Sequence, residues 1–305
     1  MKKKIKSLKR FNQNYRNFSF SDLTSHADEE FVDMEVFFDD NGNIVEEIKY
    51  GTDGEIEEKN SYSFNSNGKL LSHTLLYALD NATEKRVLTR NEKGLLISEI
   101  KYYGDDTGEK TEYEYDDKDN VNAIIRFDEE GLLISREEIK YDEKGNINDR
   151  TTFNQEKTIL SRITYTLPEN NQVEENEYDE KGILVSKTHL KFNENGKELS
   201  SLQTTPQGKL IASVLNTYDE RGNIIEKVYK DFYSKTIKYS YNEKDLLTTQ
   251  ELYDDNNLLL RKNMFEYDEE GNVIAEQTYE MDTSRGGRDK HFGTRYEYFF
   301  NSQIH

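Results

Sequence analysis

Carboxylates are the side chains of this sequence best suited to chemistry, and several occur as adjacent pairs. Asp39-Asp40, Asp105-Asp106 and Asp254-Asp255 could act as general acid and base only if the two members folded against each other. Each pair, however, opens a short polar segment that returns many times along the chain. Turn formation explains these acids, so we predict no catalytic residues and no enzymatic activity.

Metal-binding residues show no pattern either. The chain has no cysteine, and its five histidines are scattered without a pair at ligand spacing. The turns resemble calcium loops because both use Asp, Asn and Gly. When Gly42 or Gly196 is aligned with the invariant glycine of an EF-hand loop, however, Phe37 or Lys191 takes the first ligand position. We therefore predict no metal site and no cofactor.

The recurring segment has the pattern aromatic-Asp-Glu-any-Gly, and five close copies begin at Phe127, Tyr141, Tyr178, Tyr218 and Tyr267. Two series of turns alternate. The first series ends at Gly42, Gly68, Gly94, Gly145, Gly196, Gly222 and Gly271, with degenerate copies at Asp119, Asn171 and Asp245. The second series ends at Gly54, Gly108, Gly131, Lys157, Gly182, Gly208 and Asn257. Two turns in about 26 residues correspond to one β-hairpin.

Turn chemistry and strand periodicity then predict the fold. Asp or Asn at the first turn position bonds the backbone two residues on, and Gly at the last supplies positive φ, as in a type I turn with a G1 bulge. Between turns, aromatic and branched residues alternate with polar ones, as in strands with one more apolar face. The prediction is an all-β protein, an elongated antiparallel β-meander repeat array of about twenty strands in chain order.

The aromatic residues that open the turns are expected to form a structural ladder on one face. Its predicted members are Phe127, Tyr141, Phe153, Tyr178, Phe192, Tyr218, Tyr241, Tyr253 and Tyr267.

Both ends of the chain lack the repeat. We predict a basic N-terminal arm or cap over residues 1–33, the hairpin repeats over 34–280, and a loop with a capping strand over 281–305. Residues 2–11 fit either a short basic helix or an arm that becomes ordered on a partner. Because these segments occur once, they are the predicted binding residues: Lys2, Lys3, Lys4, Lys6, Lys9, Arg10, Arg285, Arg288, Lys290 and His291.

Net charge restricts the class of partner. The chain has 41 Lys and Arg against 61 Asp and Glu, a net charge of −20. Generic nucleic-acid binding needs neutralisation of phosphates, so a basic protein is the better complement. The acidity also has a second interpretation, in which the charges on strand edges and turns only prevent aggregation of one sheet with another. With no apolar run long enough for a membrane span and no secretory signal, we expect a cytoplasmic protein.

The repeat resembles the YD repeats of RHS-type proteins. Tyrosine-aspartate, two variable residues, glycine, asparagine and an aliphatic residue are present from Tyr141 to Ile147 and from Tyr218 to Ile224. The resemblance covers about residues 35–280 and implies a spiralling β-sheet, which in large family members closes into a shell around a toxin domain. This chain has neither the self-cleaving core motif nor a toxin domain of that family.

These observations favour a non-catalytic protein-binding or scaffold protein, with an acidic curved sheet that engages a protein partner. The resemblance implies a bacterial toxin or defence setting, in which an adaptor, immunity or inhibitor role would fit. A structural, shell or surface component of a secreted RHS-like assembly is the first alternative. A glycan-binding protein is the second, because exposed aromatic rows can stack on sugars.

Overall fold

The computed structural model describes residues 4–15, 27–104, 107–167, 171–282 and 289–300, which form 22 β-strands and no helix. The chain divides into two compact units. Unit 1 comprises Met1–Glu84, Glu220–Glu226 and Lys235–His305, and unit 2 comprises Lys85–Asp219 and Lys227–Ser234. The prediction of an all-β antiparallel meander is therefore confirmed.

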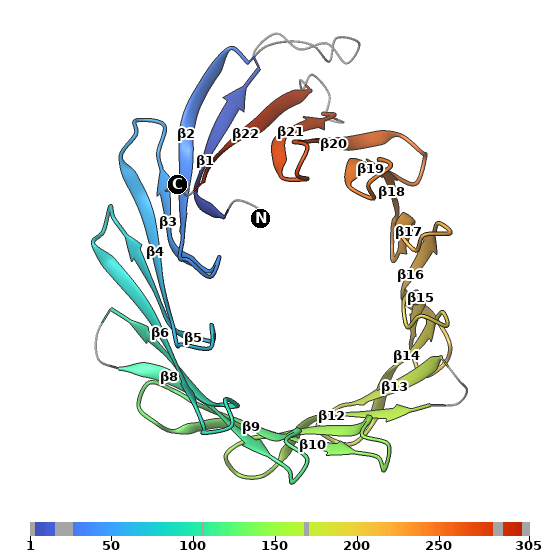
Figure 1. The fold of residues 1–305 in the computed structure, drawn as a ribbon. Coiled ribbons are helices and arrows are strands. Elements are labelled where there is room, and N and C mark those ends of the chain that lie inside the picture. Colours follow the sequence, from blue (N-terminus) through green and yellow to red (C-terminus); the bar gives the residue numbers. More distant parts are fainter. Residues whose placement is uncertain (1–3, 16–26, 105–106, 168–170, 283–288, 301–305) are drawn as a thin grey trace. The chain divides into compact units, whose positions relative to one another are not determined.

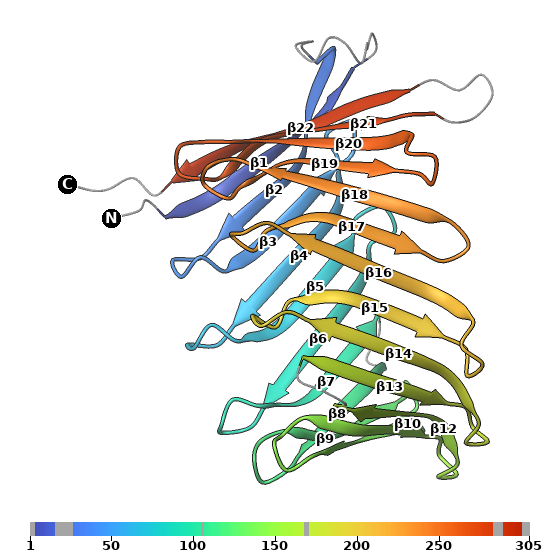
Figure 2. The same cartoon turned by 90° about the vertical axis from the view of Figure 1, so that its right-hand side faces the viewer.

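Unit 1 is built from strands of both ends of the chain. They are β1 (Ile5–Asn14), β2 (Glu29–Phe38), β3 (Ile44–Tyr50), β4 (Ile56–Phe64), β5 (Leu70–Tyr77), β18 (Ser234–Tyr241), β19 (Leu247–Tyr253), β20 (Leu259–Tyr267), β21 (Val273–Glu280) and β22 (Lys290–Phe300). All neighbours pair antiparallel, in the order β18-β19-β20-β21-β22-β1-β2-β3-β4-β5. Figures 1 and 2 show β1 between β2 and β22.

The pairing of β1 with β22 corrects two predictions. An elongated array with two separate capped ends is wrong, because the first and last strands are neighbours in one sheet. The helical alternative for residues 2–11 is also wrong, since residues 5–14 form a strand. A single basic helix of this length is marginal in water, whereas β1 gains backbone hydrogen bonds to strands on both sides.

Unit 2 is an uninterrupted meander. Its strands are β7 (Leu96–Tyr103), β8 (Gly108–Tyr115), β9 (Val121–Phe127), β10 (Leu133–Tyr141), β11 (Ile147–Phe153), β12 (Ile159–Thr166), β13 (Gln172–Tyr178), β14 (Leu184–Phe192), β15 (Glu198–Thr204) and β16 (Leu210–Tyr218). Each pairs antiparallel with the next. β6 (Ala82–Arg90) and β17 (Ile224–Lys230) contribute residues to both units.

The turns have the predicted chemistry. Asp39 Oδ1 accepts the N–H groups of Asn41 and Asn43 at 2.8 and 2.9 Å, and the Gly42 N–H donates to the Asp39 carbonyl at 3.0 Å. Gly42 has φ of 86°. The degenerate turns keep this backbone, with φ of 60–64° at Asp119, Lys157, Asn171, Asp245 and Asn257. One turn differs, because Gly104 and not Gly108 has positive φ.

The predicted aromatic ladder divides into two rows, because successive turns lie at opposite ends of the strands. Tyr141, Phe192, Tyr218, Tyr241 and Tyr267 precede first-series turns, whereas Phe127, Phe153, Tyr178 and Tyr253 precede second-series turns. A single continuous ladder is therefore wrong. Hairpin geometry separates aromatics of adjacent strands by the length of a strand, so only alternate strands place them at the same end.

Tyrosine hydroxyls tie consecutive first-series turns together. Tyr141 donates to the Val121 carbonyl at 2.8 Å, and Val121 opens the preceding strand at the same end. The same bond, at 2.7 or 2.8 Å, is made from Tyr115, Tyr218, Tyr241, Tyr267 and Tyr298 to Leu96, Glu198, Ile224, Leu247 and Val273. The recurrent Tyr therefore has a structural role that Phe cannot fill.

Loss of one such bond should be measurable. We expect Tyr141→Phe to lower the free energy of unfolding by about 1 kcal/mol, because the ring stays while the half-buried Val121 carbonyl loses its donor. Urea unfolding measures the difference, and Tyr233→Phe, at a ring that is 74% exposed, is the matched control. Equal stability of Y141F and the parent would show that water replaces the hydroxyl without cost.

Candidate functional site

The first and last strands, β1 and β22, pair along a line that we call the seam. Their pairing brings polar residues of both chain ends together. In the register of these strands Gln13 lies opposite Gly293 and Phe11 opposite Arg295, while β2 places Glu30 opposite Gln13. A Cβ atom on Gly293 would lie 2.9 Å from the Glu276 carbonyl oxygen and 3.3 Å from Gln13 Oε1. Glycine therefore gives the Gln13 side chain room at this point.

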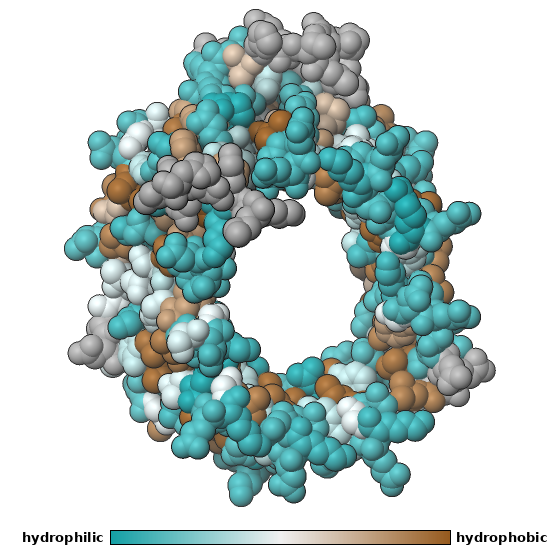
Figure 3. All heavy atoms as spheres, in the orientation of Figure 1, coloured by the Kyte–Doolittle hydropathy of each residue, from teal (hydrophilic) through white to brown (hydrophobic). Residues whose placement is uncertain are grey.

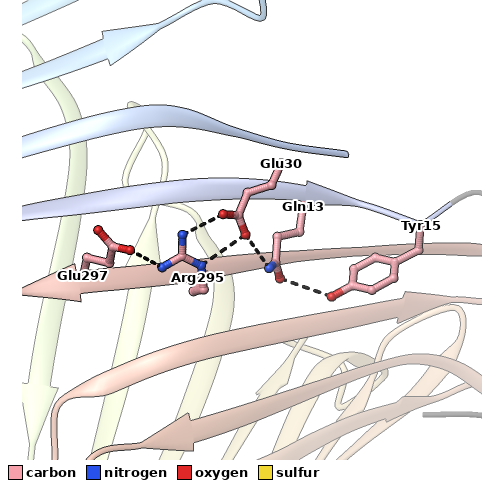
Figure 4. A network of polar contacts seen from close by, with 5 residues as sticks. All are labelled: Gln13, Tyr15, Glu30, Arg295 and Glu297. Carbon is pink, nitrogen blue, oxygen red and sulfur yellow. Dashed lines mark hydrogen bonds and ion pairs between the residues drawn. The ribbon is translucent and has the colours of Figure 1, made fainter. Parts of the chain in front are cut away.

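Arg295 is the centre of the network in Figure 4. Its Nη2 and Nε donate to Glu30 at 2.6 and 3.1 Å, and its Nη1 donates to Glu297 at 2.6 Å. The guanidinium also lies 4.0 Å from the centroid of the Phe11 ring. Hydrogen bonds from Arg295 lower the pKa of Glu30, and the bond to Glu30 raises that of Arg295. Both groups are therefore held in their charged forms.

Glu30 continues the network along β1. Gln13 Nε2 donates to Glu30 Oε2 at 2.7 Å, and the Tyr15 hydroxyl donates to Gln13 Oε1 at 3.1 Å. Figure 4 shows these side chains in a line from Glu297 to Tyr15. The line joins three strands, so it fixes the side chains of both chain ends relative to one another.

Beside Tyr15, three rings form a stack that spans β21, β22 and the residue after β1. The His291 ring lies 3.7 Å from Tyr15 and 4.1 Å from Tyr279, with interplanar angles of 18° and 17°. His291 and Tyr279 are buried, at 6% and 1% exposure. Burial lowers the pKa of His291 to about 4 and raises that of Tyr279 to about 12. At neutral pH all three rings are uncharged.

A second group joins β1 to β2 and β3. Lys9 Nζ is 2.7 Å from Glu35 Oε1, and the Tyr50 hydroxyl donates to Glu35 Oε2 at 2.7 Å. Hydrogen bonds from Lys9 and Tyr50 lower the pKa of Glu35. Burial, followed by the bond to Glu35, raises the pKa of Tyr50 to about 12. These residues and the turn at Gly51–Gly54 line an open cleft of about 460 Å³.

The titratable groups of the seam are held away from the pKa values that suit acid–base chemistry. Glu30 and Glu35 are held ionised by cations, and the shifts at His291 and Tyr50 carry their pKa values away from neutrality, whereas a general base works best near the operating pH. Across the described residues, no group of three His, Cys, Asp or Glu is placed to hold a metal ion. The same residues contain no helix with the length and apolar character needed to cross a membrane.

The structure distributes the predicted binding residues unevenly. Lys9 and Arg10 belong to β1 and are paired with Glu35 and Asp33, while Lys4 donates to the Asp40 carbonyl at 2.6 Å. Lys6 and Lys290 are exposed strand residues. Lys2, Lys3, Arg285 and Arg288 lie outside the described residues.

Two of these assignments need correction. Lys290 and His291 are not loop residues but open β22, and His291 is buried between two tyrosines. The basic residues Lys9 and Arg10 are likewise not an open cationic arm, because acids of β2 compensate them. The central residues of the seam, Glu30 and Arg295, were missed by sequence reasoning. They are far apart in the chain, and only the β1–β22 pairing brings them together.

No protein-family model and no curated protein sequence matches this chain. Among solved structures, crystal structures of TcdB2-TccC3-TEV and TcdB2-TccC3-Cdc42 are 14% and 12% identical to it, with TM-scores of 0.27 for both. The matches cover 80% and 90% of this chain, which spans only 15% and 24% of those chains. A crystal structure of a porin-like protein from Bacteroides uniformis ATCC 8492 is 8% identical, with a TM-score of 0.32, over 97% of this chain and 96% of that one.

Proposed function

We propose that this chain is a non-catalytic protein-binding or scaffold protein whose acidic turns engage a basic partner. The observation that carries the proposal is a carboxylate at the exposed corner of turn after turn, at both ends of the strands. These corner acids are Asp40, Asp53, Asp80, Glu92, Asp117, Glu129, Glu130, Glu143, Glu156, Glu180, Glu194, Glu220, Glu243, Asp255, Glu269 and Glu270. They supply much of the net charge of −20.

The Asp at the first position of the turn adds a further negative charge, and hydrogen bonds hold its carboxylate in place. The Asn that follows the turn donates its side-chain and backbone N–H groups to this Asp, which lowers the pKa of Asp39, Asp116, Asp142 and Asp268. These carboxylates stay ionised in mildly acidic solution. In the view of Figure 3 most of the surface is hydrophilic, with hydrophobic residues in smaller areas between. Such a surface attracts a basic protein through its field.

The repeat supports a more specific proposal about the protein family and the biological system to which this chain belongs. The all-β hairpin repeats with Tyr-Asp turns fit a YD-repeat-like protein of the RHS type. In such a setting an adaptor, immunity or inhibitor role is the natural use of an acidic binding surface. We also propose that selectivity comes from the seam, because its residues occur once whereas the turns recur.

The proposal is tested by isolating the partner and measuring the salt dependence of binding. Affinity purification with mass spectrometry should identify one basic protein. Its dissociation constant should rise at least tenfold between about 50 and about 500 mM salt, because the screening length falls about threefold. Replacing Glu129, Glu130, Glu156 and Glu180 with Gln should weaken binding, whereas Gln155→Ala should not. Salt-independent affinity, or binding to a glycan array instead of a protein, would contradict the proposal.

A further inference from the structure

We infer that the loop between β17 and β18 is a shallow anchor, which inserts two aromatic rings into the surface of a lipid bilayer. The loop consists of Asp231, Phe232 and Tyr233, and we call these three residues the aromatic tip. The tip belongs to unit 2, as do residues 227–230 of β17. It shares no residue with the acidic corners or with the seam, so the inference does not rest on the proposed function.

Both rings of the tip are open to solvent. Phe232 is 96% exposed and Tyr233 is 74% exposed. Among the other large hydrophobic residues that the structure describes, only Leu79 is more than 58% exposed. Single exposed apolar side chains are common on protein surfaces, whereas two adjacent rings at the end of a hairpin form a protruding apolar site. The rings bury little area in the fold, so packing does not explain them.

Turn chemistry does not explain the rings either. The second-series turns at Gly54 and Gly131 have charged corners, and each ends in that glycine, which has positive φ. In the aromatic tip, which the structure describes completely, no residue has positive φ. Asp231 closes the loop instead, because its Oδ1 accepts the Tyr233 N–H at 2.8 Å and its own N–H donates to the Tyr233 carbonyl at 3.1 Å. These bonds use only the backbone of Tyr233, so the loop does not require an aromatic side chain there or at Phe232.

Two lysines lie behind the rings. Lys230 is exposed and directly precedes the tip, and Lys227 lies three residues earlier in β17. Residues three apart in a strand point to opposite faces, so one cation lies on each side of the hairpin. The Lys227 Nζ is 4.8 Å from the ring centroid of Tyr229, which is 36% exposed. Polarity therefore increases along the hairpin, from the phenyl ring of the tip through the phenol to the ammonium groups.

The charge of this segment differs in sign from that of the chain. Lys227–Ser234 contains two lysines and one acid, Asp231, and so has a charge of +1 in a chain of −20. The second-series turn that precedes it in the chain, residues 205–208, has no charged residue. The acidic corners elsewhere are repelled by anionic headgroups, whereas a segment with a cation on each side is attracted to them.

The size of the apolar site selects a bilayer as its partner. An aromatic side chain buries roughly 150–250 Å², so the two rings offer roughly 300–500 Å². A standard protein interface buries about 800 Å² on each partner, which the tip does not supply. A bilayer needs no complementary partner surface, because the rings enter the boundary between headgroups and acyl chains while the lysines extend to the phosphates. Such an anchor binds weakly and reversibly, as a single acyl chain does.

A tryptophan reporter tests insertion directly. The chain contains no tryptophan, so Phe232→Trp places a single reporter in the tip. Vesicles of phosphatidylcholine with about a quarter phosphatidylglycerol supply the anionic surface. As lipid is added, the emission of F232W should move to shorter wavelength, and brominated lipids should quench it. Leu79→Trp, at a residue that is 94% exposed in unit 1, is the matched control, and its emission should stay unchanged.

Co-sedimentation with the same vesicles measures how much each group contributes to binding. We expect the apparent affinity of the full chain for lipid to fall at least tenfold for Phe232→Ser with Tyr233→Ser, because both inserting rings are removed. Lys227→Gln with Lys230→Gln should lower it at least threefold. Leu79→Ser and Lys6→Gln should leave it unchanged, and circular dichroism verifies that each variant is folded.

Three results would overturn the inference. The first is that the parent does not bind vesicles, or that the Phe232→Ser, Tyr233→Ser variant binds them equally well. The second is that the emission of F232W changes with protein concentration in the absence of lipid, which would show that a second copy of the chain covers the tip. The third is that its emission responds to the isolated basic partner but not to vesicles. Loss of partner binding in the acidic-corner variants would leave this inference untouched, because the tip is intact in them.

Discussion

Tyr279→Ala is expected to lower the free energy of unfolding by about 3–4 kcal/mol, the usual cost of truncating a large buried ring. Tyr279 is 1% exposed and stacks on His291 in unit 1, so its removal leaves a cavity and frees one face of the imidazole. Equilibrium urea unfolding, followed by circular dichroism, measures the change.

Two variants separate packing from other effects at this position. Tyr279→Phe keeps the ring and loses only the bond from the hydroxyl to Gln277 Oε1, so it should cost about 1 kcal/mol or less. Tyr233→Ala removes a ring that is 74% exposed and should change stability by no more than about 0.5 kcal/mol. If Y279A is as stable as Y233A, the ring stack does not support the seam.

The free energy of unfolding should decrease as the pH is lowered, because His291 becomes protonated at a higher pH in the unfolded chain than in the folded one. Its pKa is lowered to about 4 in the folded protein, against about 6.5 in an unfolded chain, because burial disfavours the imidazolium. The unfolded chain therefore binds the proton first as pH falls. The contribution of the uncharged His291 to the free energy of unfolding is complete above pH 6.5 and is lost between pH 6.5 and 4. The loss is at most about 1.4 kcal/mol per pH unit and about 2–3 kcal/mol over this range.

A variant that stacks but does not titrate isolates this effect. His291→Phe should lack the loss, so the difference in unfolding free energy between the parent and H291F should shrink or change sign from about pH 7 to about pH 4.5. The rings that face His291 do not titrate in this range, since the pKa values of Tyr15 and Tyr279 are raised. Carboxylates elsewhere titrate equally in both proteins. Parallel stability curves for the two proteins would rule out His291 as the source.

Local signals made most of the fold predictable. Asp119, Lys157 and Asn257 were assigned to turn ends only because they fall on the period of the glycines, and all three have positive φ. A turn is determined by four or five consecutive residues, so its chemistry is visible in the sequence. The same local signal misplaced Gly108. It begins β8, where a Cβ atom would lie 2.6 Å from the Lys101 carbonyl oxygen.

The seam was not predictable in the same way. In the sequence, β1 is a basic segment. The acids that pair with its cations, Asp33 and Glu35, lie on β2, and the sequence that connects β1 to β2 has no turn motif. Its pairing with β22 depends on residues at the far end of the chain and has no local signature. The role of the tyrosine hydroxyl was missed for a similar reason. Tyr141 and Val121 belong to adjacent strands, and only the register shows that they meet.

The pairing of β1 with β22 also has a consequence for synthesis on the ribosome. β1 is translated about 280 residues before its second neighbour, which appears only when residues 290–300 are made. At about 5–20 residues per second this takes roughly 15–60 s, during which one edge of β1 shows unpaired N–H and C=O groups. An open edge is a template for other chains. Nascent chains should therefore be most vulnerable to aggregation, and most dependent on chaperones, until β22 has been translated.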